Sequence, residues 1–306
     1  GTGAICTASG MSALFVTFMT LCSAGDHIVS ASQIYGSTVT LLTHTLKRFN
    51  IDCTFVSIND ESALKSAIQK NTKFVFCESI GNPGLEVSDL PKISRVAHSH
   101  NIPLVVDATF ATPSLCRPLE FGVDVVVHSA TKWIGGHGVA IGGVVIDGGE
   151  FDWGASNLHP TLTEPYEPFH GINFWEEFGP SALTMRIRAE SMRDFGPAMS
   201  PHSAFLLLQG VETLSLRMKQ HVQNAIKLSK WLLEQPCVSW VNHPDLPENP
   251  THQIAKRLFP KGAGSMLCFG VKGGRKGGAA FIDALKLSSN LANVGDSRTL
   301  VLHPAS

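Results

Sequence analysis

The stretch VVVHSATKWIGGHG, residues 125–138, decides how the rest of the sequence is interpreted. Its three valines are typical of a buried strand, yet the run ends at Ser129, Thr131 and Lys132 and then enters a glycine-rich turn. A lysine in such a place can be a Schiff-base nucleophile, because burial lowers its pKa enough to free the amine. The stretch therefore predicts a strand that carries a reactive lysine to the edge of a sheet.

Apolar runs alternate with amphipathic stretches over roughly the first half of the chain, which favours strands and helices alternating around a mostly parallel sheet. Apolar residues recur at helical spacing in 62–69 and 90–100, so we expect helices there that cover the sheet. The predicted strands are 27–30, 54–57, 74–78, 103–107, 124–128 and 142–147.

The second half of the chain has a different pattern. Residues 148–200 predict a long irregular connection. Connections of this length more often have a functional role than serve only to link two elements. Residues 203–234 predict one long helix or two in series, and 262–271 predict a strand in a separate, smaller unit. We therefore expect a large domain, residues 1–210, followed by a smaller C-terminal one, residues 211–306.

The composition limits what the protein binds. With 306 residues, 43% of them hydrophobic, the chain can bury an ordinary globular core, and its net charge of −1 gives no sign of a nucleic-acid or polybasic membrane surface. Seven cysteines without a C-x-x-C pair argue against a zinc site or a disulfide framework and favour a reducing compartment. The longest mostly apolar stretch, 11–22, is too short to cross a bilayer. We expect a soluble, cytoplasmic protein that acts on a small polar metabolite.

Polar side chains follow several of the predicted strands. Glu78 and then Asn82 follow one strand, Asp107 ends another, and Lys132 follows the valine strand. Tyr35 comes after the first predicted strand. Because loops leaving the carboxyl ends of parallel strands converge on one crevice, these residues predict a site.

The pair of Lys132 and Asp107 points to a particular cofactor. A lysine that forms Schiff bases usually needs an electron sink, and pyridoxal 5′-phosphate (PLP) requires a carboxylate that keeps its pyridine nitrogen protonated. Asp107 is suited to that role. Tyr35 offers a flat ring that can stack on the cofactor.

A phosphate group would also have its ligands. The hydroxyls of Ser129 and Thr131 point the same way from an extended chain. The stretch TASGMSALF, residues 7–15, adds the amides of Gly10 and Met11 at the start of a helix, whose dipole favours an anion.

Other kinds of site are not supported. His98 and His100 lie two residues apart on a predicted helix and face different directions, so we predict no metal site. The glycines at the start of the chain resemble a dinucleotide fingerprint, but Cys6 stands where its third glycine belongs. GGRKGG at 273–278 lacks the spacing of a phosphate-binding loop and predicts exposed turns.

Six motifs occur together along the chain: SGM at 9–11, YG at 35–36, ES with NP at 78–83, VVDATF at 105–110, SATKWIGGHG at 129–138 and NVGDSRTLVLHPAS at 293–306. Each alone is weak, but in this order they resemble the Cys/Met metabolism family of PLP-dependent enzymes, the cystathionine gamma-synthase group, over essentially all 306 residues. The resemblance implies the aspartate aminotransferase-like fold, fold type I. That fold has a large α/β domain with a mostly parallel sheet and a smaller C-terminal α+β domain.

The resemblance also implies a role for each candidate residue. Lys132 would bind PLP covalently and later move protons, Asp107 would face the pyridine nitrogen, and Tyr35 would stack on the ring and contact the substrate. Asn293 would lie against the substrate carboxylate. The remaining cofactor contacts would be Asn82 near the ring hydroxyl, and Gly10, Met11, Ser129 and Thr131 at the phosphate.

Within the family, the long connection, residues 188–214 and NVGD at 293–296 resemble the O-acetylhomoserine sulfhydrylase branch. This implies the conversion of O-acetylhomoserine and sulfide to homocysteine and acetate in methionine biosynthesis. Cystathionine gamma-synthase, cystathionine gamma-lyase and methionine gamma-lyase are the alternatives within the family. The alternative that is not an active enzyme is a relative that binds PLP but is catalytically impaired. Family members are dimers of dimers with shared active sites, so a homo-oligomer is implied.

Two family features have no counterpart in this sequence. One is a Tyr-x-Arg pair in an N-terminal arm that reaches the phosphate of a neighbouring subunit, and the other is an arginine after the HPAS motif that clamps the substrate carboxylate. The sequence begins at Gly1 and ends at Ser306. We therefore expect a fragment that binds the cofactor weakly and turns over little.

Overall fold

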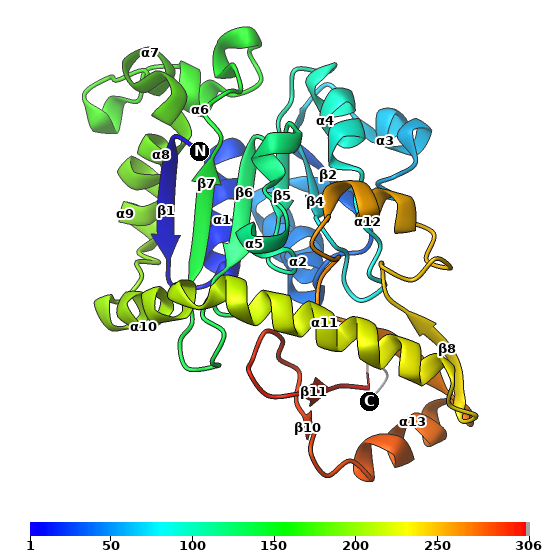
Figure 1. The fold of residues 1–306 in the computed structure, drawn as a ribbon. Helices are drawn as coiled ribbons and strands as arrows, with labels where there is room; N and C mark the ends of the chain where they lie inside the picture. The colour runs from blue at the N-terminus through cyan, green and yellow to red at the C-terminus, as the bar shows by residue number, and fades with distance from the viewer. Residues whose placement is uncertain (304–306) are drawn as a thin grey trace.

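A seven-stranded sheet forms the centre of the computed structural model, which describes residues 1–303 (Figure 1). Its strands are β1 Gly3–Thr7, β2 His27–Ala31, β3 Asp52–Val56, β4 Thr72–Glu78, β5 Leu104–Asp107, β6 Val125–Ser129 and β7 Gly143–Asp147. The strand order is β1-β7-β6-β5-β4-β2-β3. Strands β6 to β3 in that order are mutually parallel, whereas β7 is antiparallel to both of its neighbours. The predicted mostly parallel α/β fold is confirmed.

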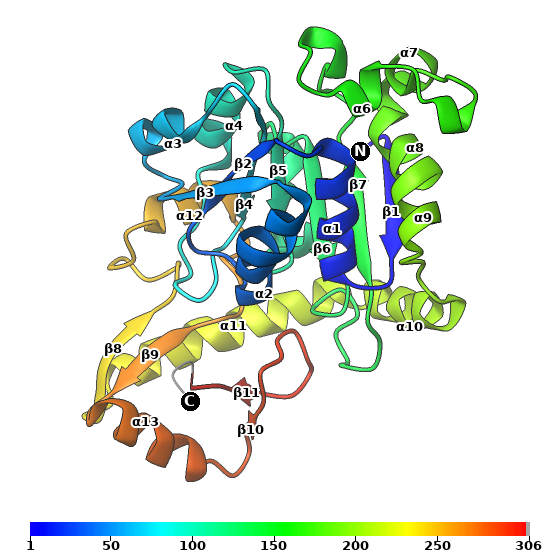
Figure 2. The ribbon, with the colours of Figure 1, turned by 180° about the vertical axis from the view of Figure 1, so that it is seen from behind.

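Helices cover both faces of this sheet. They are α1 Gly10–Leu21, α2 Gly36–Thr40, α3 Glu61–Ala67, α4 Leu90–His98 and α5 Thr112–Leu115. Helices α1 and α2 lie in front of the sheet in Figure 2, and α5 lies in front of it in Figure 1. Because both faces are covered, the three valines of β6 are all buried, which explains why that strand is continuously apolar rather than alternating.

The strands predicted between residues 27 and 147 are confirmed, with small shifts at their ends. The edge strand β1 was not predicted. Gly3 pairs with Asp147 and Thr7 with Gly143, so the partner of β1 lies far along the chain. The short segment GAICT carries little signal of its own without that partner.

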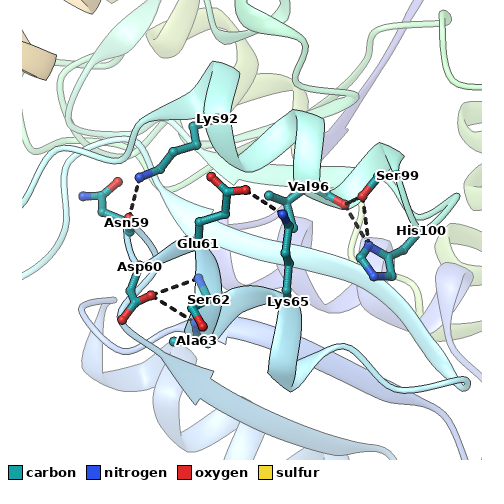
Figure 3. Close-up of polar contacts among 10 residues, drawn as sticks. All are labelled: Asn59, Asp60, Glu61, Ser62, Ala63, Lys65, Lys92, Val96, Ser99 and His100. Carbon is teal, nitrogen blue, oxygen red and sulfur yellow. Dashed lines mark hydrogen bonds and ion pairs between the residues drawn. The ribbon is translucent and has the colours of Figure 1, made fainter.

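Capping contacts explain where the covering helices begin (Figure 3). The Asp60 carboxylate accepts hydrogen bonds from the backbone N–H groups of Ser62 (2.9 Å) and Ala63 (3.0 Å), which starts α3. Lys92 of α4 donates to the backbone oxygen of Asn59 over 2.6 Å. The start of α3 is thereby tied to α4.

The connection 148–200 is not irregular, as the sequence had suggested. It folds into the short helices α6 Pro160–Thr163, α7 Phe174–Phe178, α8 Ala182–Arg186 and α9 Arg193–Phe195, with 3₁₀ and π segments between them. His159 Nε2 lies 2.9 Å from the backbone oxygen of Lys73, next to the first residue of β4. This part of the connection therefore lies at the end of the sheet opposite the carboxyl ends of the parallel strands (Figure 1).

The C-terminal part contains two helices in series, α10 Pro201–Glu212 and α11 Leu214–Leu233. Two small sheets follow, β8 Val238–Asn242 with β9 Cys268–Val271, and β10 Ser289–Asn290 with β11 Leu300–Val301. The remaining helices are α12 His252–Leu258 and α13 Gly274–Asp283. The expectation of turns at 273–278 was wrong, since α13 begins at Gly274. The division into residues 1–210 and 211–306 stays a prediction. Among residues 1–303, no helix is both long and apolar enough to span a bilayer.

The two histidines near the end of α4 have separate structural contacts. His100 Nδ1 lies 3.0 Å from the backbone oxygen of Val96 (Figure 3). His98 Nε2 lies 2.8 Å from Oδ2 of the buried Asp124, which also accepts from the backbone N–H of Leu104. The hydrogen bond that His98 donates to the Asp124 carboxylate raises the pKa of His98. Within the part of the chain that the structure describes, no cluster of three or more His, Cys, Asp or Glu side chains could hold a metal ion.

The His98–Asp124 contact predicts a pH-dependent contribution to stability. The pKa of His98 is raised on folding. The contribution of the His98–Asp124 contact to the free energy of unfolding is therefore complete below the unfolded pKa of about 6.5 and is lost as pH rises through the folded pKa. We expect His98→Gln to lower the urea midpoint of unfolding more at about pH 5.5 than at about pH 9. The exposed His44 provides the control, and an equal loss for His98→Gln at both pH values would contradict the prediction.

Candidate active site

The carboxyl ends of three adjacent parallel strands bring the predicted residues together. Glu78 at the end of β4 pairs in register with Asp107 at the end of β5. Asp107 in turn pairs with Val127, two residues before the end of β6. The segment that follows β6 carries Lys132. The carboxyl ends of these strands therefore bring two carboxylates and a lysine together at one end of the sheet.

Lys132 lies in a tight turn rather than on an extended chain. Its backbone N–H donates to the oxygen of Ser129 (3.2 Å), and its own oxygen accepts from the N–H of Gly136 (2.7 Å). The prediction of an extended 129–132 segment was therefore wrong, because the chain turns as soon as β6 ends. The ammonium group donates to Asn293 Oδ1 over 2.5 Å, and burial lowers the pKa of Lys132.

The loop that carries Asn293 packs closely on this turn. A Cβ atom added at Gly295 would lie 2.4 Å from the backbone nitrogen of Trp133 and 3.0 Å from Cα of Lys132. Gly295 also has φ +78, which glycine adopts without strain. The C-terminal loop can approach Lys132 only because this residue is glycine. The last three residues of the predicted motif 293–306 lie outside the described part of the chain.

Asp107 is a carboxylate without a cation beside it. Oδ1 accepts from the backbone N–H of Thr109 over 2.8 Å, and no ion pair to Asp107 forms among residues 1–303. Burial raises the pKa of Asp107 to about 6, and the hydrogen bonds with Thr109 lower it. A buried acid that lacks a counter-charge is what a protonated pyridine nitrogen would pair with, so Asp107 fits its predicted place.

The start of α1 meets the end of β6 at the predicted phosphate site. Ser9 caps α1, because its Oγ accepts from the backbone N–H of Ser12 over 3.0 Å. A Cβ atom at Gly10 would lie only 2.6 Å from Cβ of Ser129. The amino end of a helix and a hydroxyl residue are thus held together, which suits a bound anion. Thr131 Oγ1 donates to the oxygen of Gly142 (3.2 Å) and accepts from its N–H group (3.1 Å).

Tyr35 and Glu78 are joined across the site. The backbone N–H of Tyr35 donates to Glu78 Oε1 over 2.7 Å, and the ring of Tyr35 stays 48% exposed. Burial first, and then the nearby Asp107, raise the pKa of Glu78 well above its usual value. Tyr35 is therefore held through its backbone while its side chain stays accessible, which is compatible with the predicted stacking role.

Met11 and Asn82 are the two remaining predicted cofactor-binding residues. Met11 is partly buried, and its sulfur accepts a weak hydrogen bond from Thr38 Oγ1 at 4.0 Å. Asn82 lies in the loop after β4, at a cis peptide bond with Pro83. The structure joins Lys132 with Asn293 directly but places Asn82 in no such contact within residues 1–303.

Sequence reasoning missed Thr109. Its backbone N–H binds Asp107, and its Oγ1 accepts from the backbone N–H of Ser129 over 2.8 Å. Thr109 therefore links the ends of β5 and β6. Its position two residues after an aspartate is the sequence signal that could have found it, since aspartates commonly bind the N–H two residues on.

Fold and site together define a PLP-dependent enzyme of fold type I. The family model for the Cys/Met metabolism PLP-dependent enzymes matches residues 1–306, and the chain belongs to that family.

Individual relatives agree with this assignment. The chain is 49% identical to the homocysteine synthase of Schizosaccharomyces pombe, over 100% of this chain and 72% of the relative. It is 45% identical to O-acetyl-L-homoserine sulfhydrylase 1 of Thermus thermophilus, over 100% of this chain and 73% of the relative. The crystal structure of a putative O-acetylhomoserine (thiol)-lyase from Campylobacter jejuni, which contains N′-pyridoxyl-lysine-5′-monophosphate, superposes with a TM-score of 0.96. Its sequence is 36% identical, and the match covers 100% of this chain and 75% of that one.

The contact between Gly10 and Ser129 can be tested by adding one carbon atom. Gly10→Ala would place Cβ 2.6 Å from Cβ of Ser129 and push the start of α1 away from β6. We expect PLP to bind roughly tenfold more weakly, as overpacking costs about 1–3 kcal/mol. An absorbance titration of the cofactor-free protein measures this.

Gly3→Ala on the edge strand β1 is the matched control, since its Cβ would lie 2.6 Å from Oγ1 of Thr184 in α8. It should lower the melting temperature without weakening PLP binding. Equal PLP affinities for the Gly10 variant and the unaltered chain would contradict the prediction.

Proposed function

We propose that the protein converts O-acetylhomoserine and sulfide into homocysteine and acetate with PLP as its cofactor. The observation that carries the proposal is the Lys132 amine, whose pKa burial lowers and which lies 2.5 Å from Asn293 Oδ1, at the same sheet edge as Asp107. Support for the substrate comes from relatives named homocysteine synthase and O-acetyl-L-homoserine sulfhydrylase at 49% and 45% identity.

Each predicted residue has a place in holding the cofactor. Lys132 would bind it covalently, Asp107 would pair with the pyridine nitrogen and Tyr35 would cover the ring face. When bound, PLP supplies an electron sink for the carbanion formed next to an amino group. The remaining contacts would be Asn82 at the ring hydroxyl, and Gly10, Met11, Ser129 and Thr131 at the phosphate.

The chain's own contribution is the handling of protons. A partly buried amine with a lowered pKa releases its proton more readily than a solvated lysine, so it can accept a proton from the substrate and return it. Asn293 Oδ1 accepts a hydrogen bond from Lys132 Nζ, and the family resemblance implies that Asn293 also contacts the substrate carboxylate. The replacement balances without an oxidant, since the C–O bond to acetate breaks with its electron pair and hydrosulfide supplies the pair for the new C–S bond.

A lyase is the second candidate. The crystal structure of a cystathionine gamma-lyase from Lactobacillus plantarum superposes with a TM-score of 0.85 at 31% identity. The sulfhydrylase is favoured because the O-acetylhomoserine (thiol)-lyase from Campylobacter jejuni reaches 0.96 at 36% identity. Homocysteine formation from O-acetylhomoserine and sulfide, measured beside the cleavage of cystathionine, distinguishes the two.

We also propose that the chain forms at least a dimer and acts in the cytoplasm. Several large apolar side chains are exposed on α10 and on the loop before β7, namely Phe205, Leu208, Val139 and Ile141. This loop and α10 are neighbours, because a Cβ atom at Gly142 would lie 2.6 Å from Leu207. A patch of this kind is typical of an interface. Seven free cysteines support a reducing compartment.

Replacing the lysine tests the proposed function. Lys132→Ala should lower sulfhydrylase activity at least about a thousandfold, because both cofactor attachment and proton transfer depend on its amine. The exposed Lys65, paired with Glu61 on α3, provides the matched control Lys65→Ala. Homocysteine production is the readout, and ordinary turnover by Lys132→Ala would overturn the mechanism.

Replacing the carboxylate should separate stability from activity. Burial raises the pKa of Asp107 from 3.8 to about 6, so the folded cofactor-free protein loses stability as pH rises between these values. Asp107→Asn removes that loss, so the cofactor-free variant should be more stable than the unaltered chain at about pH 8. PLP should still bind to the variant, and its sulfhydrylase activity should fall. Urea unfolding at about pH 4 and about pH 8 measures the difference, and no gain at the higher pH would refute it.

A further inference from the structure

Arg217 of α11 reaches back to the turn that carries Lys132. Its Nη1 donates to the backbone oxygen of Trp133 over 2.7 Å, and Nη2 donates to that of Ile134 over 3.2 Å. Nη2 also donates to the oxygen of Gly210 over 2.6 Å, near the end of α10. The guanidinium of Arg217 therefore joins α10 and α11 to Trp133 and Ile134, the two residues that follow Lys132.

Two glycines make room for this contact. A Cβ atom at Gly136 would lie 2.1 Å from Nη1 of Arg217, and one at Gly210 would lie 2.3 Å from the backbone oxygen of Gly135. A side chain at Gly210 would push α10 away from the turn, and one at Gly136 would displace the guanidinium of Arg217. The glycines after Lys132, which the sequence suggested only as a turn, thus let an arginine reach the main chain beside the lysine.

The guanidinium acts on the main chain rather than on a ligand. Its Nε donates to Thr213 Oγ1 over 3.1 Å, so Nε, Nη1 and Nη2 all have protein acceptors. No carboxylate forms an ion pair with Arg217 within residues 1–303. Burial lowers the pKa of Arg217, so holding the guanidinium at the turn carries a desolvation cost.

The turn is held on its other sides by different contacts. Trp133 is buried, and its ring meets that of Phe110 edge to face at 5.2 Å, just after β5. The backbone nitrogen of Trp133 faces Gly295. The Lys132 oxygen accepts from the N–H of Gly136 over 2.7 Å, and Arg217 adds the side-chain contact to the next two carbonyls, those of Trp133 and Ile134.

We propose that Arg217 is a positioning residue for Lys132. By binding the carbonyls of Trp133 and Ile134, it fixes the direction in which the Lys132 side chain leaves the turn toward Asn293. This inference rests on the proposed function, in which Lys132 holds the cofactor. Arg217 also links α11 to the site, so a displacement of α10 and α11 would change the position of Lys132.

The test compares Arg217→Met and Arg217→Lys with the unaltered chain. The first readout is competitive acetylation of Lys132 across a pH range in the cofactor-free protein, with the exposed Lys65 as an internal reference. We expect the pH midpoint of acetylation for Lys132 to rise in both variants, because the displaced side chain regains water. Arg217→Lys keeps the positive charge, so a shift there cannot come from charge alone.

The second readout is the share of bound PLP that borohydride fixes on Lys132. We expect it to fall by about tenfold in Arg217→Met and by less in Arg217→Lys, because a small misplacement costs this much in reactive geometry. Arg186→Met is the matched control, since Arg186 is also buried but binds Glu190 and Tyr166 in the connection 148–200. It should lower stability and leave both readouts unchanged.

The outcomes separate this inference from the proposed function. If the unaltered chain fixes no PLP on Lys132, the proposed function fails, while the acetylation midpoints still report on positioning. Unshifted midpoints in both Arg217 variants would overturn the positioning role. If Arg217→Met does not fold, an unshifted midpoint in Arg217→Lys alone overturns it.

Discussion

The site depends on burying the Lys132 amine without placing a carboxylate beside it. Burial alone lowers the pKa of Lys132, and its hydrogen-bond acceptor is the neutral Asn293. A carboxylate in the same place would stabilise the ammonium form and suppress the free amine. The two carboxylates of the site, Glu78 and Asp107, instead end the neighbouring strands β4 and β5. The separation of lysine and acids onto different strand ends is what the parallel sheet provides.

Much of this arrangement could be predicted from the sequence, because it is local. Valines followed by Ser129 and Lys132, and a strand that ends in Asp107, are patterns within a few residues, and both strands were found in the structure. What could not be predicted depends on distant partners. Edge strand β1 needs β7 as its partner, and Arg217 contacts Trp133 across 84 positions in the sequence. The residues next to β1 or to Arg217 therefore do not indicate these roles.

The helices of the connection 148–200 and α13 were missed for a different reason. Both segments are rich in glycine, proline or aromatic residues, which local propensity assigns to loops. Helix α13 begins with Gly274 and contains two further glycines, yet it forms where it packs against β9 and the ring of Phe281 meets that of Phe269 at 5.4 Å. Tertiary contacts outweigh propensity there, as they do for many short helices.

The same contacts that build the site make the cofactor-free protein less stable than it could be. Burial raises the pKa of both Glu78 and Asp107 and so disfavours their charged forms, and Glu78 is also raised by Asp107. Neither has a cation partner among residues 1–303, unlike Asp124, which has His98 at 2.8 Å away from the site. Asp147 at the end of β7 is also buried without an ion pair in the described part of the chain, and burial raises its pKa to about 6, so an unpaired buried acid does not by itself mark a ligand site. The two acids at the ends of β4 and β5 differ from Asp147 in lying beside the segment that carries Lys132. We propose that the protonated ring nitrogen of the cofactor pairs with Asp107, so cofactor binding should recover part of the stability that burial of this acid costs the cofactor-free protein.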